Sequence, residues 1–199
     1  MRNGATYAAI VLAGGASRRM GYPKPWLRWD EATTYAERIL GTYRALGLHE
    51  LVLVLNADFA REPWLDALAR ASSMASLVLN PDPDAGRMRS IFLGMRAIAS
   101  DKVFLHNVDS PFVGPEVIQA LMRNDGDEQV IIPANQGKGG HPVLVKAAVK
   151  REVLAAYDRH ATLKDLLGGF TRKYVEVSSP SVLVNINTPA DLQHGHGHP

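Results

Sequence analysis

Tyr7-Ala-Ala-Ile-Val-Leu12 is a continuous apolar run, and Ala13-Gly-Gly-Ala-Ser-Arg-Arg-Met-Gly-Tyr-Pro-Lys24 follows it directly. An unbroken apolar run of this length is typical of a parallel strand that is buried on both faces. Glycines immediately after such a strand let the backbone approach a ligand closely. The two segments together predict a buried strand with a ligand-binding loop at its carboxyl end.

Strands and helices are expected to alternate along the rest of the chain. The predicted strands are residues 51–55, 77–79, 103–105, 130–132, 142–145, 174–177 and 182–184, and the predicted helices are residues 34–46, 63–71, 90–98, 115–122, 146–157 and 163–167. The alternation through residue 123 indicates an α/β fold with a three-layer, doubly wound, mostly parallel sheet. Such sheets bind ligands outside the carboxyl ends of their strands. No repeat or linker interrupts the pattern, so residues 1–199 are expected to form one domain, with its core over residues 7–193 and a His-rich tail at 194–199.

The composition is that of an ordinary globular protein and excludes several functional classes. Of the 199 residues, 46% are hydrophobic and 21% are charged, and the formal net charge is +2. This charge is too small to indicate a nucleic-acid partner. Because the chain has no cysteine, it has no disulfide, no thiolate metal site and no cysteine nucleophile. No apolar run approaches the roughly 20 residues of a membrane helix, and we see no signal-peptide pattern, so a cytoplasmic location without a membrane partner is expected.

The loop over residues 13–24 has the features of a triphosphate clamp. Gly14 and Gly15 expose backbone N–H groups that can hold phosphate oxygens, and Arg19 and Lys24 add positive charge. A phosphoryl group undergoing substitution carries charge on its equatorial oxygens and needs such a clamp. The loop lacks the closing Gly-Lys-Ser/Thr of a Walker motif, and basic residues stand where a dinucleotide-binding loop has its later glycine. Neither of those two patterns therefore describes it.

Residues 12–24 resemble the Leu-Ala-Gly-Gly-x-Ser-x-Arg-Met-Gly-x-x-Lys signature of the molybdopterin guanylyltransferase and cytidylyltransferase family. Four later segments resemble motifs of the same family in the same order: Asp84-Ala-Gly-Arg-Met-Arg-Ser-Ile-Phe-Leu-Gly94, Val108-Asp-Ser-Pro111, Gly140-His-Pro-Val143 and Asn185-Ile-Asn-Thr-Pro-Ala-Asp-Leu192. The resemblance spans residues 7–193. It implies a Rossmann-like nucleotidyltransferase fold and magnesium-dependent transfer of a nucleoside monophosphate from an NTP, with release of pyrophosphate.

The resemblance also implies roles for individual residues. The expected nucleotide-binding residues are Leu12, Ala13, Gly14, Gly15, Ser17, Arg19, Lys24, Asn80 and Ser90. Arg19 and Lys24 are also expected to be catalytic, since their charges would neutralise the phosphates, with Lys24 at the α-phosphate as pyrophosphate leaves.

Asp109 is the third expected catalytic residue, as a ligand of Mg²⁺, a hard cation that prefers oxygen ligands. Asn187 and Asn185 are the expected further ligands, and Mn²⁺ is the alternative metal. His141 and Arg89 are the candidates for contact with the acceptor. Ser90 is expected to read the base edge, to cap the helix that follows, or to do both.

The family scaffold implies that the acceptor's own phosphate oxygen attacks the α-phosphorus, because a phosphate monoester is largely ionised near neutral pH. The segments around Ser90 and His141 resemble the cytidylyltransferase branch and favour CTP. Ala13-Gly-Gly15 and Asn185-Ile-Asn187 resemble the guanylyltransferase branch and keep GTP open. The expected acceptor is molybdopterin, with a sugar phosphate or alcohol phosphate as the alternative, and a molybdoenzyme or its chaperone is the implied protein partner.

An alternative outside the enzymes is a nucleotide-binding regulator or cofactor carrier that retains the nucleotide pocket but has no turnover. The neutral asparagines Asn185 and Asn187 favour this reading. The presence of Arg19, Lys24 and Asp109 argues against it.

Overall fold

The structure, a computed structural model, describes residues 6–159 and 162–195. Within them the strands form one 8-stranded sheet of order β3-β2-β1-β4-β7-β5-β6, with β8 paired to β5. The strands are β1 (Tyr7–Ala13), β2 (Glu50–Asn56), β3 (Ser76–Asn80), β4 (Lys102–Asn107), β5 (Val130–Asn135), β6 (Lys138–Gly139), β7 (Val143–Val145) and β8 (Arg172–Glu176). β1, β2, β3 and β4 pair in parallel, as do β5 and β8, whereas β7 runs antiparallel to both β4 and β5. The expected α/β fold with a mostly parallel sheet is confirmed.

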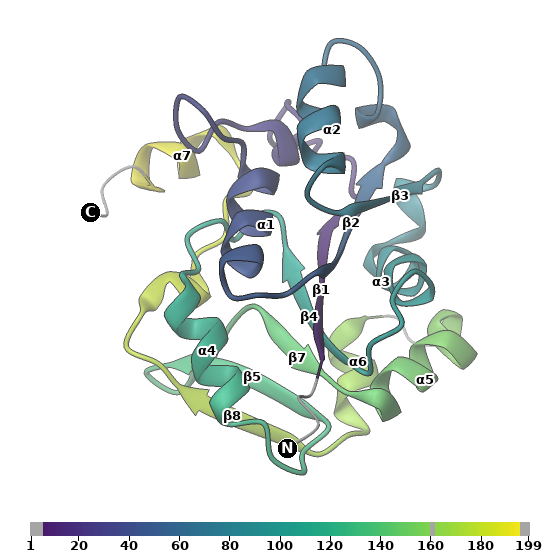
Figure 1. The fold of residues 1–199 in the computed structure, drawn as a ribbon, viewed down its shortest axis with the longest axis vertical. Helices are drawn as coiled ribbons and strands as arrows, with labels where there is room; N and C mark the ends of the chain where they lie inside the picture. The colour runs from purple at the N-terminus through teal and green to yellow at the C-terminus, as the bar shows by residue number, and fades with distance from the viewer. Residues whose placement is uncertain (1–5, 160–161, 196–199) are drawn as a thin grey trace.

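Helices cover both faces of the sheet (Figure 1). They are α1 (Tyr35–Ala45), α2 (Leu65–Ser72), α3 (Arg87–Arg96), α4 (Pro115–Arg123), α5 (Ala147–Ala156), α6 (Leu163–Gly168) and α7 (Pro189–Gly195), with short 3₁₀ helices η1 (Lys24–Trp26), η2 (Ala57–Phe59), η3 (Pro83–Ala85), η4 (Tyr157–Arg159) and η5 (Pro180–Leu183). One buried cluster joins the sheet to α1, α2 and α4, and a second joins it to α3, α5 and α6. The result is the expected three-layer arrangement.

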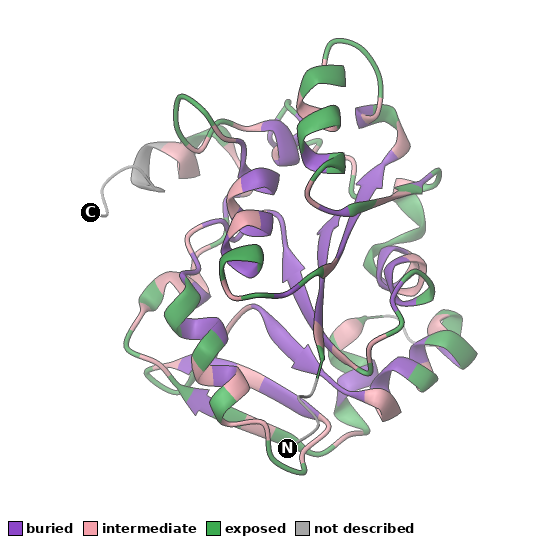
Figure 2. Ribbon diagram, viewed as in Figure 1, coloured by how far each residue is buried: buried purple, intermediate pink, exposed green. Residues whose placement is uncertain are grey.

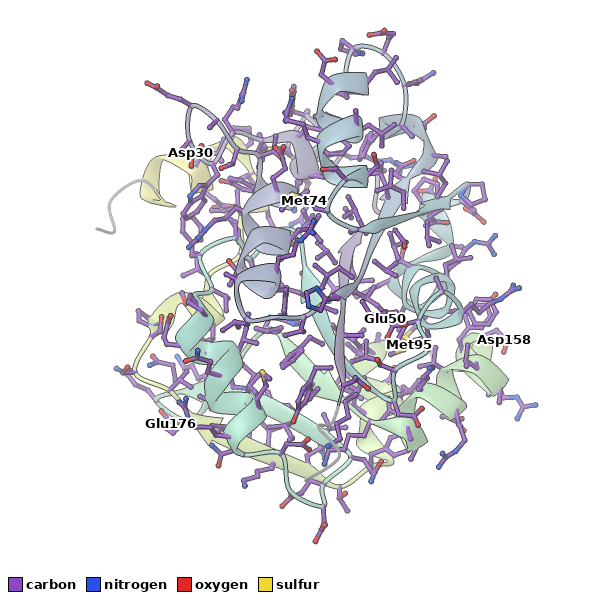
Figure 3. The ribbon with its side chains drawn as sticks, viewed as in Figure 1. Asp30, Glu50, Met74, Met95, Asp158 and Glu176 are labelled. Carbon is purple, nitrogen blue, oxygen red and sulfur yellow. The ribbon has the colours of Figure 1, made fainter. Side chains whose placement is uncertain are left out.

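β1 lies inside the sheet, between β2 and β4, and is buried on both faces. Ala9, Val11 and Ala13 belong to the first cluster, while Ala8, Ile10 and Leu12 belong to the second. Figure 2 shows the central strands as buried and the outer surfaces of the helices as exposed. Met74 and Met95, both labelled in Figure 3, belong to the side-chain layers on the opposite faces of the sheet. The apolar run that opens the sequence therefore forms the centre of the core.

The chain order reverses at β1, and this reversal creates the binding crevice. β2 and β3 extend the sheet on one side of β1, and β4 lies on its other side with Leu12 opposite Asn107. The loops that leave β1 and β4 therefore begin side by side at the same edge of the sheet, which is where open α/β sheets bind ligands. These carboxyl ends point towards the upper part of Figure 1.

Most predicted elements are present with shifted ends, but one prediction is wrong. Residues 182–184 do not form a strand, because η5 occupies most of this segment. Pro180 starts the 3₁₀ turn, and Val182 is buried in a small cluster with Val113 and Val117, against which Leu183 also packs. Helix α7 and the short strand β6 were not predicted. Of the expected His-rich tail, residues 194 and 195 end α7, and residues 196–199 lie outside the described residues.

Among the described residues, none of the helices combines the length and the apolar character that crossing a membrane would require.

Candidate functional site

The loop that follows β1 doubles back on itself before it reaches Lys24. Ser17 and Gly21 have positive φ angles of 51° and 69°. The backbone N–H groups of Met20 and Gly21 donate to the Ser17 carbonyl over 3.0 and 3.2 Å, and the Lys24 N–H donates to Ser17 Oγ over 3.3 Å. Glycine adopts a positive φ without steric cost, which explains Gly21 at this turn. Ser17 thus organises the loop and returns Lys24 to the end of the strand.

A cavity of about 340 Å³ lies at the carboxyl ends of β1 and β4. Its walls are the loop after β1, the first turn of α3, the end of β4 and the segment before α7. Ten of the predicted site residues line it: Leu12, Ala13, Gly14, Gly15, Ser17, Arg19, Lys24, Ser90, Asp109 and Asn187. The fold therefore brings together residues that are up to 175 positions apart in the sequence, from Leu12 to Asn187.

Two basic side chains and two oxygen ligands meet at one edge of this cavity. Lys24 Nζ donates to Asn187 Oδ1 over 2.8 Å and lies 3.5 Å from Asp109 Oδ2. Arg19 donates to the same Asn187 Oδ1 over 3.2 Å. Burial lowers the pKa of Lys24, and the negative charge of Asp109 partly opposes this effect. The predicted catalytic residues Arg19, Lys24 and Asp109 are therefore neighbours in space.

Asp109 and Asn187 fit a divalent cation. Asp109 Oδ1 is buried without a hydrogen-bond partner in the described structure, so this carboxylate retains an unused acceptor oxygen. The Ile186 N–H donates to the Asp109 carbonyl over 2.8 Å, and Asp191 accepts the N–H groups of Asn187 and Thr188 over 2.8 Å each. These backbone bonds fix the two side chains relative to each other. Within the described part of the chain, no three His, Asp or Glu side chains gather to hold a metal, so a metal here would need further oxygens from a ligand.

Asn185 is separated from this cluster. Its Oδ1 accepts the Ser110 hydroxyl over 2.9 Å, and the residue lines a neighbouring cleft with Ile186 and Asp191. Asn185 and Asn187 therefore face different cavities, and of the two only Asn187 lies beside Asp109.

Gly14, Asn80 and Ser90 form a tight contact at the start of the loop after β1. Asn80 Nδ2 donates to the Gly14 carbonyl over 3.2 Å and to Ser90 Oγ over 3.3 Å. A side chain at position 14 would collide with Ser90 Oγ, so this close approach requires glycine. Asn80 does not line the cavity, and it acts by holding Gly14 and Ser90. Ser90 lies inside α3, whose N-cap is Gly86, so the expectation that Ser90 caps this helix is wrong.

The two candidate acceptor contacts lie outside the cavity lining. Arg87 lines the cavity, whereas Arg89 does not, and Arg89 Nε is buried without a hydrogen-bond partner in the described structure. His141 Nε2 lies 3.0 Å from Asn107 Nδ2, and Asn107 does line the cavity. Since an amide nitrogen only donates, this ring nitrogen accepts and the neutral ring carries its proton on Nδ1. Burial, and then the charge of Arg87, lower the pKa of His141 and favour this neutral form.

Sequence reasoning missed Asn107 and His106. Asn107 ends β4 beside the end of β1, and its place at the carboxyl edge was the available signal. His106 points to the other face of the strand, where Tyr43 OH lies 3.0 Å from Nδ1 and the Ser110 carbonyl lies 2.9 Å from Nε2. Because a carbonyl only accepts, Nε2 carries the proton and Nδ1 accepts from Tyr43. His106 therefore supports the turn that carries Asp109.

An ion pair joins the loop after β1 to the turn before α3. Arg18 lies 2.7 Å from Asp84, and both side chains are largely exposed. An exposed pair of this kind contributes little stability. It leaves Arg18 free to exchange Asp84 for another anion at the mouth of the cavity.

Comparisons with known proteins show which sequences this chain is similar to. The family model described as MobA-like NTP transferase domain matches residues 9–177. A molybdenum cofactor cytidylyltransferase of Escherichia coli K12 is 26% identical over 185 residues, which are 92% of each chain. A probable molybdenum cofactor guanylyltransferase of Methanosarcina mazei is 29% identical over 204 residues, covering 96% of this chain and 90% of the relative.

A solved structure from Mycobacterium tuberculosis H37Rv has the same fold. It covers 96% of both chains with a TM-score of 0.78 at 20% identity. A second structure of that protein, a complex with manganese, aligns with a TM-score of 0.72 at 18% identity and covers 95% of this chain and 97% of that one. At these identities the likeness shows the Rossmann-like fold.

Proposed function

The chain belongs to the MobA-like NTP transferase family, and from this premise we propose that it transfers CMP from CTP to the phosphate of molybdopterin and releases pyrophosphate. A molybdoenzyme or its chaperone would receive the product. The observation that carries the proposal is the meeting of Arg19, Lys24 and Asp109 with Asn187 at one edge of a cavity between β1 and β4.

The loop after β1 would bind the triphosphate. The Gly14–Ser90 contact brings the loop backbone against α3, and the glycine N–H groups are the available donors for phosphate oxygens. The first turn of α3 lines the same cavity and has no side-chain cap. Its free N–H groups therefore add to the positive field that an anion would meet there. Arg19 and Lys24 would neutralise charge as pyrophosphate forms.

Asp109 and Asn187 would hold a divalent cation through the unpartnered Asp109 Oδ1 and the Asn187 Oδ1. Mg²⁺ suits oxygen ligands and takes the rest of its shell from water and substrate phosphates. Mn²⁺ is the alternative, and the manganese complex of the structural neighbour supports it. The cation would supply charge neutralisation at the phosphates.

The transfer itself needs no protein nucleophile. An oxygen of the acceptor's phosphate would form a bond to the α-phosphorus while the bond from this phosphorus to the bridging oxygen of the β-phosphate breaks. Since that acceptor oxygen is already ionised near neutral pH, the protein's contribution is position and charge. Lys24, held at the inner end of the loop, would face the oxygen at which negative charge develops on the leaving pyrophosphate.

Ser90 supports the preference for a cytosine base. Its Oγ accepts from Asn80, so its hydroxyl proton remains free to donate into the cavity that it lines. Cytosine presents two neighbouring acceptors, O2 and N3, on the edge that such a donor would read. The cytidylyltransferase relative favours the same base, while the guanylyltransferase relative keeps GTP as its competitor.

A pyrophosphate-release screen tests the proposal. CTP, GTP, ATP and UTP are each combined with molybdopterin, with sugar phosphates and with alcohol phosphates, in the presence of Mg²⁺ or Mn²⁺. We expect the highest rate for CTP with molybdopterin. A higher rate with GTP or with another acceptor would replace that part of the assignment. Calorimetric binding of an NTP without pyrophosphate release from any combination would identify the chain as a nucleotide-binding regulator or carrier.

A further inference from the structure

Lys24 lies between the same two oxygens that are the candidate metal ligands. Its Nζ is 2.8 Å from Asn187 Oδ1 and 3.5 Å from Asp109 Oδ2. Only 12% of the Lys24 side chain and 16% of the Asp109 side chain are exposed, so the contact is shielded from bulk water. A single ammonium therefore reaches the oxygens that a divalent cation would use.

This contact is looser than a structural ion pair of the same chain. Asp125 lies 2.5 Å from Lys102 and 2.6 Å from Lys146, so both lysine ammoniums are in direct contact with its carboxylate. Each Asp125 oxygen faces a lysine ammonium, whereas the Asp109 contact is longer and engages only Oδ2, and Asp109 Oδ1 has no hydrogen-bond partner in the described structure. The ammonium therefore leaves part of the ligand capacity of Asp109 unused.

An ammonium and a divalent cation cannot both occupy this position. Two like charges this close repel each other strongly where the contact is shielded from bulk water, and a doubly charged ion doubles the repulsion. Lys24 must therefore move when a metal binds to Asp109 and Asn187. Its four-carbon stem is flexible, and Lys24 lines the cavity at the end of β1, so its ammonium has space into which it can move.

We propose that Lys24 is a displaceable internal cation: its ammonium holds the Asp109–Asn187 pair in the nucleotide-free protein and is exchanged for a divalent cation when the metal–nucleotide complex binds. The released ammonium then pairs with the triphosphate, and this destination rests on the proposed function. The exchange has a consequence for the free protein alone. Lys24 should weaken the binding of free metal, so that metal enters together with the nucleotide.

Titration of the nucleotide-free protein with Mn²⁺, followed by the electron paramagnetic resonance signal of free Mn²⁺, tests the exchange. Lys24→Met removes the charge and keeps a side chain of similar shape. We expect this variant to bind Mn²⁺ roughly tenfold or more tightly than the wild type, because one competing charge is absent. The double variant Lys24→Met/Asp109→Asn should lose that gain, since it removes the carboxylate on which the added affinity depends.

Arg18→Met is the matched control. It removes one positive charge from the same loop, but Arg18 pairs with Asp84 and its side chain is 74% exposed. Its effect on Mn²⁺ affinity should stay within about twofold, because exposed charges are screened by salt. Circular dichroism and thermal melting verify that each variant is folded, and Lys24→Gln repeats the comparison if Lys24→Met is not.

Two results would overturn the exchange. One is a folded Lys24→Met or Lys24→Gln protein that binds Mn²⁺ no more tightly than the wild type, including no detectable binding by either. The other is an equal gain in Arg18→Met, which would show a general effect of loop charge. Neither result depends on turnover, so a failed pyrophosphate screen with a positive Mn²⁺ result would reject the transferase proposal alone.

Discussion

The two ends of the parallel strands use buried charge in opposite ways. At the amino ends, Asp125 accepts the Tyr7 hydroxyl over 2.7 Å and lies 2.5 Å from Lys102 and 2.6 Å from Lys146. Only 4% of the Asp125 side chain is exposed. Nearby, Lys150 donates to three consecutive carbonyls after α3 over 2.8 to 3.0 Å. These cations are matched by acceptors of the protein itself.

At the carboxyl ends the same residue types are incompletely matched. Lys24 lies 3.5 Å from Asp109, and Asp109 Oδ1 has no hydrogen-bond partner in the described structure. Arg18 holds only an exposed carboxylate. A buried polar group without a partner is costly, so its persistence calls for an explanation. The comparison favours a structural role for the amino-end charges and, under the proposed function, a ligand-binding role for the carboxyl-end charges.

The largest expected effect is at the amino ends. Asp125→Ala leaves Lys102 and Lys146 without their carboxylate, and loss of one partner of a buried ion pair costs roughly 3–5 kcal/mol. We expect the free energy of unfolding, measured with urea, to fall by about that amount. Asp127→Ala, which removes an exposed carboxylate two residues away, is the control and should change it by less than about 0.5 kcal/mol. An Asp125→Ala protein as stable as this control would contradict the structural role of the amino-end cluster.

Lys24→Ala should lower turnover and leave stability nearly unchanged, which is the opposite of the effect expected for the amino-end cluster. Loss of one charge partner of the transition state lowers turnover by roughly 100-fold, or about 3 kcal/mol, while the free energy of unfolding stays nearly constant. Lys102→Ala removes the same charge at the amino ends and should lower stability while leaving the turnover of folded protein unchanged. Pyrophosphate release and urea unfolding, measured on both variants, provide the crossed comparison. If both lysines affected stability alone, the assigned role of Lys24 would be wrong.

The amino-end cluster was also the part that the sequence did not reveal. Tyr7, Lys102 and Asp125 lie far apart in the chain, and nothing in their neighbours marks them as partners. The continuous apolar run of β1 and the glycines after it were sufficient to predict this buried strand and the position of the cavity. Local pattern thus predicted elements that bury a continuous face, whereas ion pairs across the sheet depend on topology.

The same limit applies to the candidate site. The resemblance to the family motifs predicted Lys24, Asp109 and Asn187, and the buried strand before Asp109 also placed that residue at the carboxyl edge. It gave no means of separating Asn187 from Asn185, since alternate side chains of an extended segment face different cavities only once η5 and α7 are in place. Residues 182–184 were mistaken for a strand for a related reason: an apolar triplet has no period that distinguishes a strand from a buried turn.

A third prediction concerns His106, the next-to-last residue of β4. Burial lowers the pKa of His106 to about 4, so the fold keeps the ring neutral near pH 7, with Nε2 donating to the Ser110 carbonyl and Nδ1 accepting from Tyr43. The unfolded chain binds a proton near pH 6.5, so the unfolded state holds more protons between these values and stability rises with pH. The contribution of the neutral His106 ring to the free energy of unfolding is complete above about pH 6.5 and is lost as the pH falls towards about 4.

Urea unfolding of the wild type at about pH 7 and about pH 5 should show a loss of roughly 2 kcal/mol from this residue. His106→Gln keeps a polar side chain but does not titrate, so its loss over the same interval should be smaller by that amount. Because all carboxylates are retained, the difference between the two proteins isolates His106. Equal pH dependence in both proteins would show that the ring is not held neutral by the fold.

The smallest expected effect sharpens the carboxyl-end side of the comparison. Asn187→Asp introduces a second carboxylate beside Asp109, which strengthens a divalent site. Lys24 and Arg19 both donate to the position that this carboxylate would occupy, so the new charge also strengthens their hold on it. The two effects oppose each other, and the Mg²⁺ concentration that gives half of maximal turnover should fall by only about two- to fivefold, or below about 1 kcal/mol. Asn185→Asp, which faces the neighbouring cleft, is the matched control and should leave that concentration unchanged. A lower Mg²⁺ requirement in Asn185→Asp alone would assign the ligand role to Asn185 and not to Asn187, because a new carboxylate should strengthen metal binding only where it contacts the metal.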